Sequence, residues 1–132
     1  MNPQALQRFE EFLTYLVREL NQLSDEKGVV LVEGKRDAIA LRNIGYKGEI
    51  VSIASLKQRE PLGLLERANI VVILTDLDRE GRQLAARYVK LLIHNGIKSS
   101  LEYRKRLLIA SRGTFLHIEN LRRFAHLNQD LT

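Results

Sequence analysis

Two apolar runs that each end in acidic residues constrain the fold of this chain more than any other feature. Residues 29–32 are all apolar and lead directly into Glu33, while residues 70–75 form a second uncharged run that leads into Asp76 and Asp78. Strands that are buried on both faces appear in a sequence as unbroken apolar runs of this kind. Open α/β sheets bind their ligands at the carboxyl ends of such strands. The two runs therefore predict an α/β sheet with a ligand site at the edge where these strands end.

The hydrophobic pattern predicts strands and helices that alternate along the chain. Apolar residues recur every three or four positions in residues 3–23, which indicates an amphipathic helix near the start of the chain. Such alternation is typical of a parallel sheet that is covered by helices on both faces. We expect strands at residues 29–33, 50–54, 70–75 and 97–102, a polar loop at residues 55–60, and further helices at residues 36–43, 61–67, 79–94, 103–110 and 118–127.

Length and composition predict one folded domain over residues 1–132. Hydrophobic residues make up 45% of the chain and charged residues 28%, which is typical of a globular protein. The absence of cysteine excludes disulfides and thiolate metal sites, so any metal should be bound by oxygen. No stretch approaches the roughly 20 apolar residues of a membrane span, and no secretory signal is visible. We therefore expect a cytoplasmic protein without membrane association or disulfide-linked partners.

The net charge of +5 comes entirely from the second half of the chain. Residues 1–60 carry nine basic and nine acidic residues, whereas residues 61–132 carry twelve basic and seven acidic residues. A basic surface next to an acidic cluster is what a protein needs when phosphates of a nucleic acid must meet both arginines and a metal. The competing interpretation is that the charge serves solubility alone.

The acidic residues would form one cluster if the first and third strands are neighbours, as in the strand order 2-1-3-4. Glu33, Asp76 and Asp78 would then meet at one edge of the sheet, and their repulsion would require a cation. Carboxylate oxygens are ligands for magnesium, with manganese as the alternative ion. The competing interpretation is that one aspartate caps the helix that starts near Arg79 and that Glu33 pairs with a neighbouring cation.

Basic residues flank both acidic segments and predict a rim that binds phosphate. Four of them adjoin the acids, and two follow the second predicted strand. The expected rim consists of Lys35, Arg36, Lys57, Arg59, Arg79 and Arg82. The competing interpretation is an ordinary solvated surface.

For the remaining basic residues and the histidines, the sequence predicts only general roles. The basic run of residues 104–106, together with arginines at positions 112, 122 and 123, is expected to follow a nucleic-acid backbone. The histidines His94, His117 and His126 are interpreted as residues at helix surfaces or helix ends.

The motifs Glu33-Gly34-Lys35-Arg36-Asp37 and Asp76-x-Asp78-x-x-Gly81 resemble those of the Toprim domain. This domain is shared by type IA and type II topoisomerases, bacterial-type primases, ribonucleases that mature 5S ribosomal RNA, overcoming-lysogenization-defect nucleases and recombination mediators. The resemblance covers residues 28–105 and is strongest to small stand-alone Toprim proteins of archaea and some bacteria. It implies a three-layer α/β/α, Rossmann-like fold with about four mainly parallel strands. The helix at residues 1–24 and a helical extension at residues 106–132 would be additions to this core.

The resemblance also implies roles for individual residues. Glu33 matches a glutamate that acts as a general acid or base, or as a metal ligand. Asp76 and Asp78 match a pair that binds the metal. Gly34 and Gly81 match the turn glycines, and Gly34 is expected to let the backbone come close to a bound phosphate. Asp37 and Gly81 match supporting positions, although a favourable helix-dipole charge equally explains Asp37.

The function implied is a magnesium-dependent action on nucleic-acid phosphodiesters, as a nuclease or an RNA-processing factor. One alternative is a non-catalytic adaptor that binds nucleic acid within an RNA-processing or replication assembly. A second is primase-like nucleotidyl transfer. We do not expect topoisomerase activity, because the chain has no room for a separate domain with a nucleophilic tyrosine. Turnover, the choice of DNA or RNA and the oligomeric state are left open.

Overall fold

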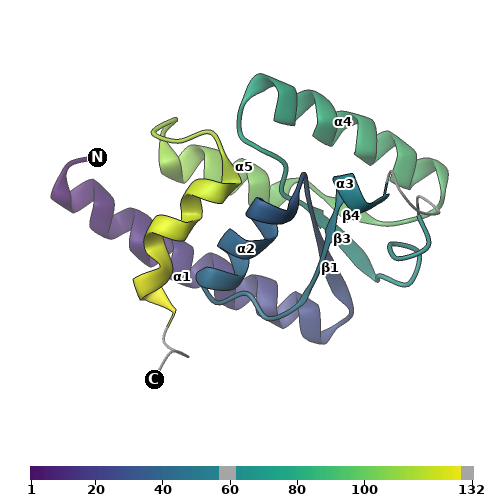
Figure 1. Ribbon diagram of the computed structural model, residues 1–132, viewed down its shortest axis with the longest axis horizontal. Coiled ribbons are helices and arrows are strands. Elements are labelled where there is room, and N and C mark those ends of the chain that lie inside the picture. Colours follow the sequence, from purple (N-terminus) through teal and green to yellow (C-terminus); the bar gives the residue numbers. More distant parts are fainter. Residues whose placement is uncertain (57–61, 129–132) are drawn as a thin grey trace.

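The computed structural model describes residues 1–56 and 62–128 and contains a four-stranded sheet with helices on both faces (Figure 1). In chain order the elements are α1 (Pro3–Asp25), β1 (Gly28–Val32), α2 (Lys35–Asn43), β2 (Glu49–Ser52), α3 (Ile53–Leu56), β3 (Ile70–Ile73), α4 (Arg79–His94), β4 (Ser99–Ser100), α5 (Glu102–Ser111) and the 3₁₀ helix η1 (Ile118–Leu127).

The sheet is parallel throughout, with the strand order β2-β1-β3-β4, which confirms the predicted topology. In the central pair, Leu31 of β1 lies opposite Ile73 of β3. After β1 the chain continues into α2 on one face of the sheet, whereas after β3 it continues into α4 on the other face (Figure 1). The carboxyl ends of β1 and β3 therefore form a topological switch point, which is where open α/β sheets bind ligands.

Both faces of the central strands are covered, which explains why their sequences are unbroken apolar runs. Val30 and Val72 contribute to the core formed with α1, α2, α5 and η1. Their neighbours Val29 and Val71 point to the opposite face and contribute to a second core with α4. Because the side chains of a strand alternate between faces, a strand between two cores needs an apolar residue at every position.

Several boundaries differ from the sequence-based predictions for local reasons. The second strand ends at Ser52, and residues 53–56 form the short helix α3 instead of strand and polar loop. The Ser52 hydroxyl oxygen accepts a hydrogen bond from the Ser55 amide at 3.1 Å, which caps this helix. Residues 62–67 form turns rather than a helix, and the preceding residues 57–61 lie outside the described part of the chain. The predicted edge strand is shorter than expected, because β4 contains only two residues.

The C-terminal segment, residues 112–128, follows α5 and includes η1. It folds back over α1 and packs chiefly against α2 (Figure 1). Phe9 of α1 holds this segment in place. The ring of Phe9 forms T-shaped contacts with the rings of Phe115 and Phe124, at centroid distances of 5.5 and 5.2 Å. The helix predicted at residues 118–127 is a 3₁₀ helix with a non-helical backbone at Phe124. Among the described residues, no helix is long and apolar enough to cross a membrane.

Replacement of Phe9 by alanine should lower the free energy of unfolding by about 3–5 kcal/mol, because it leaves a cavity between α1 and the C-terminal segment. The measurement is urea unfolding followed by circular dichroism. Tyr15, an aromatic residue of the same helix with 55% of its surface exposed, provides the control. Tyr15→Ala should change stability by less than about 0.5 kcal/mol. Equal effects of the two substitutions would contradict the packing role of Phe9.

Candidate metal centre

Glu33 connects the carboxyl ends of the two central strands. It follows the last residue of β1, and its Oε2 accepts a hydrogen bond of 2.7 Å from the backbone amide of Asp76, just beyond β3. The parallel pairing of β1 with β3 makes this contact between residues 43 positions apart. The structure thus brings Glu33 next to the Asp76–Asp78 turn, as the predicted strand order requires.

Asp76 and Asp78 each use one carboxylate oxygen to bind a backbone amide. Asp76 Oδ1 accepts a hydrogen bond of 2.8 Å from Ile118, and Asp78 Oδ1 accepts one of 2.7 Å from Gly81 at the start of α4. The competing interpretation as a helix cap is therefore correct for Asp78. In both residues the second oxygen, Oδ2, faces the imidazole of His117. The backbone contacts fix the orientation of the two carboxylates without occupying both of their oxygens.

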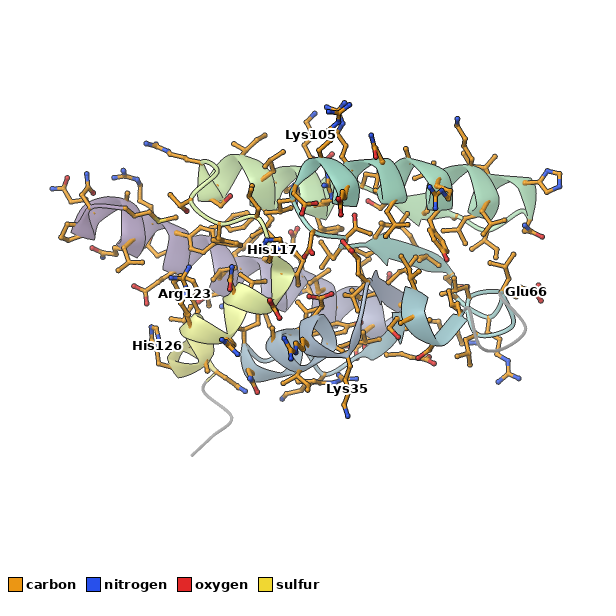
Figure 2. All side chains as sticks on the ribbon, turned by 45° about the horizontal axis from the view of Figure 1, so that its top comes forward. Lys35, Glu66, Lys105, His117, Arg123 and His126 are labelled. Carbon is orange, nitrogen blue, oxygen red and sulfur yellow. The ribbon has the colours of Figure 1, made fainter. Side chains whose placement is uncertain are left out.

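His117 lies next to these two aspartates, although sequence reasoning gave it only a place at a helix end. Its Nδ1 is 3.3 Å from Asp76 Oδ2 and 3.8 Å from Asp78 Oδ2. Asp76, Asp78 and His117 each offer one ligand atom, and these atoms all lie within 4.8 Å of one another. No motif spacing links position 117 to the acidic segments, because the contact depends on the folding back of the C-terminal segment. Figure 2 shows His117 at the start of η1, where this segment meets the body of the protein.

The concentration of carboxylates changes the proton affinity of several groups. Burial raises the pKa of the Glu33 carboxyl, and the nearby carboxylates of Asp76, Asp37 and Asp78 raise it further, although the bond from the Asp76 amide acts in the opposite direction. The hydrogen bond with Asp76 raises the pKa of the His117 imidazole. The site is thus a region of negative potential that favours protons or metal cations.

Asp37 has a structural role at the start of α2. Its side chain is buried, and its Oδ2 accepts a hydrogen bond of 3.1 Å from the Gly34 amide. The backbone of Glu119 lies near this carboxylate and acts to lower its pKa, so Asp37 faces the C-terminal segment. Burial raises the pKa of this carboxyl, with Asp76 and Glu119 adding to the effect. Gly34 itself has an extended backbone and open space where a side chain would project.

Arg104 is a buried cation beneath the acidic turn. Its Nε donates to the carbonyl and the hydroxyl of Thr75 at 3.3 and 3.2 Å, and its Nη2 donates to the Asp76 carbonyl at 2.6 Å. Burial lowers the pKa of its guanidinium, whereas Asp78 and Glu33 raise it. The prediction that Arg104 follows a nucleic-acid backbone is wrong, because only 7% of the residue is exposed. Its contacts hold the turn that presents the aspartates.

The predicted phosphate-binding residues are only partly brought together. Arg79 and Arg82, both exposed, line a cavity of about 370 Å³ next to Asp78 that is also lined by Leu77, Arg104 and Leu108. Lys35 and Arg36 are exposed at the start of α2, and Figure 2 shows the Lys35 side chain pointing away from the body of the protein. Lys57 and Arg59 lie outside the described residues. Of the predicted rim residues that the structure describes, Arg79 and Arg82 are the two that line a cavity beside Asp78.

Replacement of Arg104 by methionine should lower the free energy of unfolding by about 2–4 kcal/mol, because buried carbonyls lose charged hydrogen-bond donors. Lys105 on the same helix is exposed and points outward in Figure 2, so Lys105→Met is the matched control. The control should change stability by less than about 0.5 kcal/mol. Thermal and urea unfolding of both variants provide the measurement. A fully stable Arg104→Met protein would show that the guanidinium does not support the turn.

Replacement of Gly81 by alanine should destabilise the protein by about 1–3 kcal/mol or more, because a β-carbon there would collide with the Asp76 carbonyl. This carbonyl cannot move freely, since Arg104 binds it. Gly34→Ala is the control, with an expected cost of less than about 1 kcal/mol because nothing lies near its β-carbon position. Urea unfolding distinguishes the two variants. A smaller loss for Gly81→Ala than for Gly34→Ala would contradict the close packing.

Comparisons with known proteins agree with this arrangement. A UPF0292 protein of Methanocaldococcus jannaschii is 33% identical over 129 residues, covering 93% of this chain and 94% of that protein. A UPF0292 protein of Methanosarcina barkeri is 36% identical over 119 residues, covering 88% of this chain and 79% of that protein. A solved structure from Aquifex aeolicus matches with a TM-score of 0.67 at 26% identity, covering 80% of this chain and 94% of that chain. The family model of the Toprim domain matches residues 28–107. The chain therefore belongs to the Toprim domain family, which implies a metal-dependent function related to nucleic acids.

Proposed function

We propose that this protein acts on nucleic-acid phosphodiester bonds with the help of a divalent metal ion, magnesium or manganese, as a nuclease or an RNA-processing factor. One observation carries the proposal. Glu33 at the end of β1 binds the backbone of Asp76 at the end of β3, so three carboxylates share one edge of the sheet. Neighbouring ionised carboxylates repel each other, and a divalent cation bound between them relieves the repulsion.

The donor atoms fit such an ion. Backbone amides hold one oxygen each of Asp76 and Asp78, and the two Oδ2 atoms both lie near His117 Nδ1, so they share one region. Carboxylate oxygens bind magnesium and manganese well, and magnesium typically takes only one or two carboxylates from a protein. When bound, the ion would stabilise negative charge on a phosphate and lower the pKa of a bound water. Asp76 and Asp78 are the residues that would hold it.

Glu33 is placed to move a proton. Only one of its oxygens is engaged by the Asp76 amide, and its raised pKa brings the carboxyl closer to the range in which it exchanges protons near neutral pH. A general acid must lie within hydrogen-bond distance of the group it protonates. The position of Glu33 beside the Asp76–Asp78 turn would meet this requirement for a phosphodiester bound at the turn.

Arg79 and Arg82 are the cations best placed to bind the substrate phosphates. They line the cavity that borders Asp78, at the start of α4, where the helix dipole also favours an anion. No aromatic residue is among the described residues that line this cavity. Recognition of the phosphate backbone is therefore favoured over stacking on bases.

The double variant Asp76→Asn with Asp78→Asn should lose metal-dependent cleavage by at least about 100-fold while keeping its fold. An asparagine side-chain oxygen can still accept the hydrogen bonds from Ile118 and Gly81, but it no longer carries the charge that holds a cation. The measurement is a panel of labelled single- and double-stranded DNA and RNA substrates, incubated with magnesium or manganese. Asp25→Asn is the control, because this exposed aspartate precedes β1 and so lies toward the opposite end of the strand.

The outcomes separate the proposed enzyme from its alternatives. Cleavage by the wild type that persists in the double variant would contradict the proposal. Salt-sensitive binding of nucleic acid without cleavage under either metal would identify the protein as an adaptor instead. Incorporation of labelled nucleotides in a parallel assay would identify nucleotidyl transfer.

A further inference from the structure

The segment that supplies His117 lies outside the part of the chain that matches the Toprim model. The match ends at residue 107, and the segment then returns to the acidic turn through contacts on both sides of His117. The Leu77 amide donates to the Leu116 carbonyl at 2.6 Å, and the Ile118 amide donates to Asp76 Oδ1 at 2.8 Å. The backbone of His117 is thus held between two hydrogen bonds to the turn that carries the aspartates. This anchoring directs its imidazole at the space between Asp76 and Asp78.

We propose that His117 is a third protein ligand, through Nδ1, of a divalent transition-metal ion held by Asp76 and Asp78. This assignment rests on the metal site of the proposed function and adds to it a ligand and a preference. Imidazole nitrogen is a ligand of first-row transition metals such as iron and zinc, and manganese, although it also takes carboxylate oxygens, accepts nitrogen more readily than magnesium, which takes oxygen ligands. The site should therefore prefer manganese to magnesium.

The distances between the donor atoms support this assignment. Ligand atoms at about 2.1 Å from an ion are separated by roughly 3.0 Å when adjacent in an octahedron and by roughly 4.2 Å when opposite. The His117 Nδ1 lies 3.3 Å from Asp76 Oδ2 and 3.8 Å from Asp78 Oδ2, between these two limits. All three ligand atoms lie within 4.8 Å of one another, so the side chains would need to close slightly to bind one ion. The ligating form of the imidazole carries its hydrogen on Nε2, and 50% of the His117 side chain is exposed to solvent.

The chain offers a second histidine that serves as a matched control. His126 lies at the other end of η1, and its Nε2 is 2.6 Å from Glu10 Oε2 (Figure 2). It therefore forms a pair with a single carboxylate and belongs to no group of three metal-ligating side chains among the described residues. If any exposed histidine beside a carboxylate bound manganese, the two positions would behave alike.

The test is binding of manganese and of magnesium to the full chain without substrate, measured by calorimetry. The wild type should bind manganese at least about 10-fold more tightly than magnesium. His117→Ala should weaken manganese binding by about 10- to 100-fold and change magnesium binding by less than about twofold. His126→Ala should change neither. Unchanged manganese affinity in His117→Ala, or no binding of manganese by the wild type, would overturn the assignment.

Pulsed electron paramagnetic resonance of the manganese-loaded protein reports the ligand directly. The wild type and His126→Ala should show nitrogen modulation from a bound imidazole, and His117→Ala should not. Absence of this modulation in the wild type would overturn the assignment even if a variant failed to fold. Nitrogen modulation in a protein that cleaves no nucleic acid would contradict the proposed function but not the role of His117. Cleavage by a protein that lacks the nitrogen modulation would support the proposed function and contradict the role of His117.

Discussion

The parallel pairing of β1 with β3 is the constraint on which the rest of the structure depends. It places the carboxyl ends of two strands side by side, with their helices on opposite faces. The backbone amide of Asp76, beyond β3, can then donate a hydrogen bond of 2.7 Å to Glu33 Oε2, beyond β1. Without this pairing the acidic residues would lie at unrelated places on the surface. With it, every candidate role for Glu33, Asp76 and Asp78 concerns one small region.

Carboxylates gathered in this way work against folding, and the structure supplies partners for them. Backbone amides bind Glu33 and one oxygen of each aspartate, and the buried guanidinium of Arg104 lies beneath the turn. Burial raises the pKa of Glu33, and the neighbouring carboxylates raise it further, which indicates that these donors do not cancel the negative potential. The remaining potential favours a cation at the site. The same interactions therefore stabilise the fold and leave room for a metal ion.

The C-terminal segment brings His117 next to the two aspartates from outside the residues that match the family model. Phe9 fixes its packing against α1, while Ile118 and His117 contact Asp76 directly. Metal binding and the docking of this segment should consequently stabilise each other, because a ligand that binds only the folded arrangement favours that arrangement. Through this coupling the C-terminal segment would contribute to metal binding as well as cover the sheet.

The sequence by itself determined the layers of the fold and the region of the acidic site, whereas the strand order was implied only through the resemblance of its motifs to the Toprim domain. Unbroken apolar runs require burial on both faces, and the Asp76-x-Asp78-x-x-Gly81 pattern is local enough to be recognised without a structure. Only the tertiary structure decided which other residues join the site. Arg104 lies beneath the turn, and His117 lies beside it, because the segments carrying them fold back across the molecule. Hydrophobic periodicity specifies which face of an element is buried, but contacts between polar side chains far apart in the chain depend on how the elements pack.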